Sequence, residues 1–335
     1  MPSISSFLNQ KLFDTDVEQI PIRKGFGDGL VIAGEKDTRI VGLSADLTES
    51  TQMLAFRNKF PNRFVELGVA EQNLAAVASG MAAMGKIPVI TSYAMFSPGR
   101  NWEQIRTTIS YNDRKVFIAG SHAGVSVGPD GGTHQAIEDI ALMRVIPNMT
   151  VIAPCDAIEA RKATIAGLAD TQKTPVYVRL AREKTPVITT EETPFEIGKG
   201  VVMYKSQEIA DHMSSDVLIC STGALTYQAI CAAKELEEKH GKMVVVLHFH
   251  TIKPFDVDLL VSYAEHAVKV VTVEEHQIAG GFGSVVCEVL SEKCPRHVYR
   301  IGVQDQFGQS GTPAELIQHY GMDVESIVER ALSTV

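Results

Sequence analysis

Two acidic side chains, Glu66 and Glu71, occur in the otherwise apolar segment 64–71. A carboxylate carried into a packed interior must be paired, protonated or used in a reaction. Glu71 lies three residues before a run rich in Ala, Gly and Met, 74–84, which is typical of a closely packed helix. We therefore expect Glu71 to take part in the chemistry of the site and Glu66 to support the fold. The alternative for Glu71 is a paired structural acid.

A second group of titratable side chains lies in the segment 120–135, where His122, Asp130 and His134 occur among five glycines. The segment follows an expected strand, and loops at the carboxyl ends of parallel strands form the ligand crevice of an open sheet. Glycine lets the backbone approach a ligand, and imidazoles exchange protons near neutral pH. The pattern predicts a binding loop, with a turn of satisfied polar groups as the alternative.

Two aromatic residues, Tyr93 and Phe96, follow the end of another expected strand, 87–91. Taken alone, such residues are more typical of a packed core than of a cofactor site. Their function depends on what lies around them.

The elements that position these residues follow an alternating pattern of short β-branched runs and longer helical segments. This rhythm predicts an α/β fold of two domains, each a mostly parallel sheet flanked by helices. The expected strands are 39–43, 87–91, 115–119, 149–153, 176–180, 217–220, 243–247 and 268–273. The expected helices are 74–84, 102–111, 157–171, 225–240 and 257–264. Glycines 280, 281 and 283 do not match a dinucleotide-binding motif and favour a tight entry from strand to helix.

A stretch rich in Pro, Thr and Glu, 183–195, interrupts the rhythm, and 335 residues are enough for two domains. We place the first domain at 1–188, a linker at 189–197 and the second domain at 198–335.

Composition narrows the classes of partner. The net charge of −9 is spread without a basic cluster, which argues against binding to nucleic acid or to an anionic membrane. No apolar stretch approaches the roughly 20 residues that span a bilayer, and no secretory signal pattern is present at the N-terminus. Five cysteines without a C-x-x-C spacing suggest buried thiols rather than disulfides or zinc ligands. We expect a cytoplasmic protein with small-molecule partners.

Taken together, several motifs resemble the C-terminal half of transketolases, that is, the pyrimidine-binding domain followed by the C-terminal domain. The motifs occur in the order expected for that family, at 44–48, 68–72, 93–96, 122–135, 145–148 and 251–254. The resemblance covers nearly the whole chain beyond about residue 20. It implies thiamine diphosphate as the cofactor, sugar phosphates as substrates and transfer of a two-carbon ketol unit between them.

The resemblance also implies roles for individual residues. Glu71 matches the catalytic glutamate that hydrogen-bonds the aminopyrimidine ring of the cofactor, and Phe96 and Tyr93 match the aromatic residues that pack around this ring. His134, also a catalytic candidate, and Asp130 match residues that bind the sugar hydroxyls. The positions that match the binding site of the distal phosphate are His122, Arg182, Arg23 and Ser50.

The family's pyrophosphate-binding domain and its metal-binding motif have no counterpart in these motifs. Gly27-Asp28-Gly29 followed by Asn58 resembles that motif, but segment 22–35 has helical spacing, and the motif requires a preceding strand. We therefore expect no metal ligands in this chain. Mg²⁺ and the diphosphate are expected on a separate N-terminal transketolase subunit, in a heterotetramer containing two copies of each chain.

Three other functions remain open. A split 1-deoxyxylulose-5-phosphate synthase and the beta subunit of a 2-oxo-acid dehydrogenase use the same cofactor. The dehydrogenase is disfavoured because Asp130 and His134 have no role on a 2-oxo acid. The synthase is disfavoured because 97–102 lacks the sequence that the synthase carries there. The third is a non-catalytic phosphosugar-binding or scaffold protein, which would not need the acid at Glu71.

Overall fold

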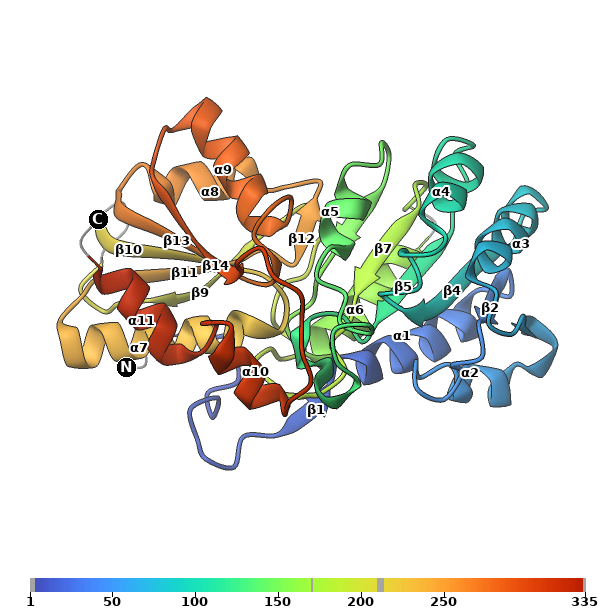
Figure 1. Ribbon diagram of the computed structural model, residues 1–335, viewed down its shortest axis with the longest axis horizontal. Coiled ribbons are helices and arrows are strands. Elements are labelled where there is room, and N and C mark those ends of the chain that lie inside the picture. The colour runs from blue at the N-terminus through green and yellow to red at the C-terminus, as the bar shows by residue number, and fades with distance from the viewer. Residues whose placement is uncertain (1–3, 170, 210–213, 334–335) are drawn as a thin grey trace.

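The chain folds into two main sheets with flanking helices, and these two sheets lie side by side (Figure 1). The computed structural model describes residues 4–169, 171–209 and 214–333. Both sheets are mostly parallel, as the alternating sequence pattern predicts, and the expected fold class is confirmed. None of the helices in these described segments is both long and apolar enough to cross a membrane.

The first sheet has seven strands in the order β12-β6-β7-β5-β4-β2-β3, all parallel except β12, which runs antiparallel to β6. Its central strands are apolar and covered on both faces, as in parallel sheets generally. The strands are β2 (Ile40–Ser44), β3 (Phe64–Glu66), β4 (Ile87–Tyr93), β5 (Phe117–Ser121), β6 (Thr150–Ile152), β7 (Val176–Arg179) and β12 (Thr251–Lys253).

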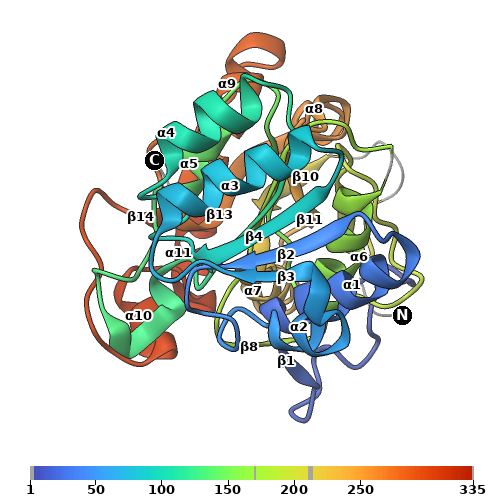
Figure 2. The same ribbon diagram turned by 90° about the vertical axis from the view of Figure 1, so that its right-hand side faces the viewer.

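Helices cover both faces of this sheet, with α3 and α4 on one side and α1 and α2 on the other (Figure 2). They are α1 (Ile22–Lys36), α2 (Leu54–Lys59), α3 (Glu71–Ala83), α4 (Trp102–Gln104), α5 (Asp139–Arg144) and α6 (Ala157–Leu168). The helix expected over 102–111 continues beyond α4 as a π-helix, Ile105–Ser110.

The helix expected over 22–35 is present as α1 despite its glycines, so the resemblance of Gly27-Asp28-Gly29 to a metal motif does not extend to its structure. The glycines allow α1 to pack closely on α6. A Cβ on Gly25 would lie 1.8 Å from the carbonyl oxygen of Ala157. The neighbouring backbone therefore leaves no room for a side chain at position 25.

The second sheet has five strands in the order β14-β13-β10-β11-β9, parallel except for β9. The strands are β9 (Val201–Lys205), β10 (Ser215–Ser221), β11 (Val244–His248), β13 (Ala267–Gln277) and β14 (Val298–Val303). The helices around it are α7 (Thr226–His240), α8 (Val257–Ala264), α9 (Phe282–Lys293), α10 (Pro313–His319) and α11 (Val324–Leu332). Helix α9 begins after Gly281, which confirms the expected glycine entry from strand to helix. A separate antiparallel pair joins β1 (Gln19–Pro21) and β8 (Lys184–Pro186).

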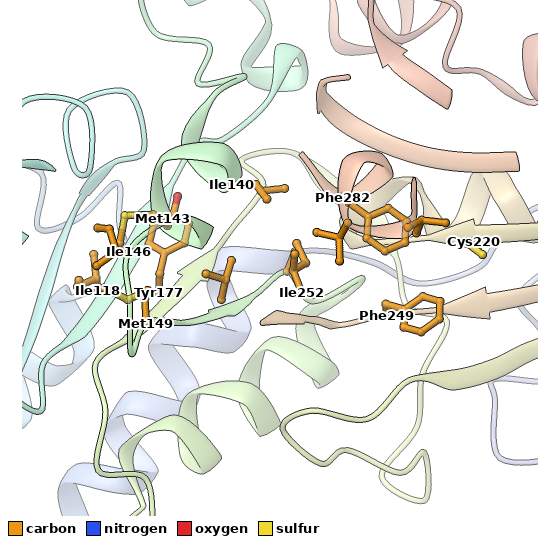
Figure 3. Packing of buried hydrophobic residues seen from close by; sticks show 14 of the residues in the cluster. Ile118, Ile140, Met143, Ile146, Met149, Tyr177, Cys220, Phe249, Ile252 and Phe282 are labelled. Atoms are coloured by element: carbon orange, nitrogen blue, oxygen red, sulfur yellow. The ribbon is translucent and has the colours of Figure 1, made fainter. Parts of the chain in front are cut away.

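One apolar cluster runs through both sheets. Figure 3 shows Ile252, from β12, between Tyr177 and Ile118 of the first sheet and Phe249 and Phe282 of the second part of the chain. Because this cluster is continuous, each domain loses buried apolar surface if the two separate. The apolar contact therefore holds the two sheets in one arrangement.

A buried polar contact also joins the two parts. Glu159 in α6 accepts hydrogen bonds from the Cys155 N–H, at 2.7 Å, and from Nε2 of His248 at the end of β11, at 2.8 Å. Burial alone would raise the pKa of Glu159, but His248, His250 and the Cys155 N–H outweigh it and lower this pKa to about 2. Glu159 is therefore an ionised acid inside the domain contact.

This shift makes stability depend on pH in a defined window. Because the folded-state pKa of Glu159 lies below its ordinary value of 4.5, its carboxylate contributes stability above pH 4.5, and that contribution is lost as the pH falls toward 2. We expect Glu159→Gln to flatten the fall in the free energy of unfolding across this window. Urea unfolding at a series of pH values measures it, with the exposed Glu196→Gln as the matched control. An unchanged pH slope in Glu159→Gln would contradict this assignment.

Candidate active site

The residues predicted to form the site lie together along the edge of the seven-stranded sheet that is formed by the carboxyl ends of its parallel strands. Tyr93 is the last residue of β4, His122 directly follows β5, and Arg182 lies shortly after β7. Strands β4 and β5 pair in parallel, with Tyr93 opposite Ser121. Parallel pairing thus brings side chains that are distant in sequence to one edge of the sheet.

Four rings form a cluster at this edge. Tyr93 stacks on His122 with ring centroids 3.8 Å apart, and Phe96 meets His134 edge to face at 5.3 Å. Tyr93 and Phe96 are themselves stacked at 6.1 Å. Both are only half-buried, so they line the site rather than fill the core.

Glu71 is the first residue of α3, and its side chain is 3% exposed. Nη1 of Arg100 lies 3.2 Å from its Oε2, and the same guanidinium lies over the ring of Phe96, 4.2 Å from the centroid. Glu71 and Arg100 line a pocket of about 500 Å³ together with the neighbouring residues Val69, Ala70, Gln72 and Asn73. Glu71 is therefore a buried, paired acid at the wall of a pocket.

Arg100 is a site residue that sequence reasoning missed. Its backbone N–H donates to the carbonyl oxygen of Phe96 at 2.8 Å, so a hydrogen-bonded turn returns its side chain over the ring. The available signal was a cation four residues after an aromatic residue, which lets the guanidinium reach the ring where the chain turns back.

Arg23, from α1, and Arg182 lie beside His122. Arg23 Nε donates to the carbonyl oxygen of Arg182 at 3.2 Å, and its Nη1 donates to the carbonyl oxygen of Ser50. Ser50 thus contacts the site through its backbone. Arg182 Nη1 lies 3.8 Å from Oδ1 of Asp130. Burial, reinforced by the charges of Arg23 and Arg182, lowers the pKa of His122 to about 3. The arrangement is a neutral imidazole next to two cations.

Glu66 does not lie in the interior, contrary to the expectation for an acid in an apolar segment. It is exposed, because β3 is the edge strand of the sheet. Its carboxylate accepts hydrogen bonds from the Asp46 N–H at 2.7 Å and the Thr48 hydroxyl at 2.9 Å. Partial burial opposes the shift, but these bonds and that from the Gly68 N–H lower the pKa of Glu66. Glu66 holds the loop after β2, which is a structural role.

Two glycines of segment 120–135 pack closely against the chain that precedes α10. A Cβ on Gly132 would lie 2.6 Å from the carbonyl oxygen of Gly308, and one on Gly131 would lie 2.7 Å from the Ser310 hydroxyl. The small size of these two residues allows the segment that precedes α10 to pack closely.

Among the described residues, one group has the composition of a metal site: Cys155, Glu159 and His248. It lies in the domain contact, where its carboxylate already accepts the two hydrogen bonds described above.

Comparison with known proteins identifies the family of both domains. The family model of the transketolase pyrimidine-binding domain matches residues 18–187, and that of the transketolase C-terminal domain matches residues 207–327. A chain of Methanocaldococcus jannaschii named as a transketolase C-terminal section is 42% identical, covering 93% of this chain and 95% of the relative. A 6-deoxy-6-sulfo-D-fructose transketolase subunit of Clostridium is 36% identical, covering 95% and 96%.

A solved structure described as a split-gene transketolase, an inactive beta4 tetramer, has 40% identity and a TM-score of 0.82, covering 94% of this chain and 97% of that one. A 1-deoxy-D-xylulose-5-phosphate synthase of Synechococcus is 35% identical over 92% of this chain, which spans 46% of that relative. Both domains, their order and the relatives of matching length lead to one conclusion: the chain belongs to the transketolase family and carries its pyrimidine-binding and C-terminal domains.

Proposed function

We propose that this chain is the C-terminal subunit of a thiamine diphosphate-dependent transketolase, which transfers a two-carbon ketol unit from a ketose phosphate to an aldose phosphate. The observation that carries the proposal is the Glu71 carboxylate, buried at a pocket wall and within reach of the same guanidinium that covers Phe96. A buried acid at a pocket beside an aromatic face is suited to a polar heteroaromatic ring.

The donor set fits the aminopyrimidine of the cofactor. Glu71 would hold a proton at a ring nitrogen, while Phe96 and Tyr93 would orient the ring by stacking. Thiamine diphosphate supplies, when bound, the carbon nucleophile that carries a two-carbon unit between sugars. Arg100 would have to share Glu71 and Phe96 with this ring, because it contacts both.

The sugar would lie against the loop that follows β5. Asp130 and His134 would hydrogen-bond its hydroxyls, with His134 oriented by the Thr133 hydroxyl, which lies 2.9 Å from Nδ1. Arg23 and Arg182 would bind the distal anion, since guanidinium groups match phosphate or sulfonate oxygens in geometry and charge.

The anion site can be tested by the titration of His122. Because its pKa of about 3 results from burial and from two neighbouring cations, we expect His122 to stay neutral between about pH 5 and 8. Inorganic phosphate near Arg23 and Arg182 should raise this pKa, and Arg182→Gln should also raise it in the absence of phosphate. Imidazole NMR shifts measure both, with the exposed His297 as reference. A phosphate effect of equal size at His297 would argue against a specific anion site.

We propose that a separate N-terminal subunit supplies the ligands of Mg²⁺ and of the diphosphate, in a heterotetramer with two copies of each chain. Apolar side chains are exposed at both ends of α3: Val69, which lines the Glu71 pocket, is 68% exposed, and Met84, at the opposite end of the helix, is 84% exposed. Such side chains favour a covering protein surface.

Substitution of Glu71 tests the central role. With the partner subunit and cofactor present, Glu71→Ala should lower ketol-transfer turnover at least about 100-fold, because a proton-transfer group is removed. Assembly, followed by size-exclusion chromatography with light scattering, should be unchanged. Glu66→Gln is the matched control and should keep turnover, because Glu66 is exposed and holds a loop. If Glu71→Ala turns over normally, the proposal is wrong, whereas loss of assembly would favour a purely structural acid.

The synthase and the 2-oxo-acid dehydrogenase are the alternative activities. The sequence similarity to a synthase makes the synthase reaction an alternative to test. Both use a 2-oxo acid as the donor, which lacks the hydroxyls that Asp130 and His134 would bind. With the partner present, we expect ketose phosphates to serve as two-carbon donors and pyruvate to be inert. Product analysis by mass spectrometry distinguishes them, and turnover of pyruvate with release of CO₂ would overturn the transketolase proposal.

A further inference from the structure

Glu275 is a buried acid of the C-terminal domain that has no role in the proposed chemistry. It lies near the end of β13 and is 3% exposed. Its Oε1 accepts a hydrogen bond of 2.6 Å from the backbone N–H of Ser126. Ser126 belongs to the 3₁₀ segment Val125–Asp130, which is kinked at Gly128 and lies between His122 and His134 in the loop that would bind sugar.

The loop backbone leaves room for this carboxylate. Gly124 has a φ of +89°, in the left-handed region that favours glycine. A Cβ at Gly124 would lie 2.2 Å from Oε1 of Glu275, which is far inside contact distance. The glycine is thus required both by its backbone conformation and by the close approach of Glu275.

Other bonds to the C-terminal domain hold the remainder of the loop. Gln135 Nε2 donates to the carbonyl oxygen of Val125 and, across the domains, to that of Gln309, each at 2.9 Å. The Gln277 N–H donates to the carbonyl oxygen of Ile137 at 2.8 Å. The loop therefore lies between strand β5 of its own domain and the end of β13.

We infer that the C-terminal domain determines the shape of the substrate loop, and that Glu275 is the positioning residue that does so through the Ser126 N–H. The role of this loop in binding sugar rests on the proposed function. Glu275 touches neither substrate nor cofactor in this assignment. It acts by keeping His122, Asp130 and His134 in one arrangement.

The physical consequence of removing Glu275 follows from burial. In Glu275→Ala the Ser126 N–H loses its acceptor in the interior, and a buried donor without a partner is costly enough to favour a shifted loop. Glu275→Gln keeps a carbonyl oxygen at this position and should largely preserve the bond. Glu274→Gln is the matched control, because Glu274 is the adjacent buried acid but accepts from the N–H groups of Phe282 and Gly283 within the C-terminal domain.

Hydrogen–deuterium exchange of the full chain tests the positioning role without requiring activity. We expect Glu275→Ala to accelerate amide exchange in residues 123–135, with little change in Glu275→Gln and none in Glu274→Gln. Gly124→Ala, which presses on the same carboxylate from the loop, should reproduce the effect and serves if Glu275→Ala does not fold. Unchanged exchange in the loop of the folded variants, or equal acceleration by Glu274→Gln, would overturn the inference.

Kinetics with the partner subunit separate positioning from general destabilisation. Glu275→Ala should raise the KM for the ketose phosphate about tenfold, as expected for a misplaced binding loop, and leave the Kd for thiamine diphosphate unchanged. An unchanged KM in a variant with a loosened loop would overturn the functional part of the inference. If the wild-type pair shows no ketol transfer, the proposed function fails, while loop exchange still decides whether Glu275 orders the loop.

Discussion

A single buried guanidinium, that of Arg179, connects the sheet, the site loop and the second domain. Its Nε pairs with Oδ2 of Asp139 at 3.0 Å, and its Nη2 donates to the carbonyl oxygens of Glu275 at 2.7 Å and Ala136 at 3.3 Å. Burial alone would lower the pKa of Arg179, but Asp139 and Glu275 outweigh it and raise this pKa. A charge taken out of water needs all of these partners. The requirement fixes the end of the loop against both the first sheet and β13.

The site follows from this constraint. Parallel strands place Tyr93, His122 and Arg182 along one edge of the sheet. The Arg179 contacts and the C-terminal domain hold the loop that carries His134 against that edge. Glu71 and Arg100 form an ion pair at the wall of the Glu71 pocket, and the cations Arg23 and Arg182 lie beside His122.

Much of the fold and part of the site could be predicted because both depend on local patterns. Strand and helix runs alternate in the sequence. Tyr93 ends a strand, and Phe96, His122 and His134 follow strands whose ends are recognisable. Arg100 was missed because its role depends on a turn that returns it over Phe96. The interior position expected for Glu66 was wrong because the order of strands in the sheet, with β3 at the edge, cannot be read from an apolar run.

The sequence by itself determined the types of element, the family and the candidate residues, because periodicity and motifs are properties of short segments. Only the tertiary structure decided what surrounds those residues. It places Glu71 in an ion pair and makes the imidazole of His122 neutral beside two cations. It also packs the glycines of the loop closely against the C-terminal domain. The physical reason is that burial, charge pairing and close backbone approach depend on partners distant in the sequence, from Glu71 and Arg100, 29 positions apart, to Glu275 and Ser126, 149 positions apart.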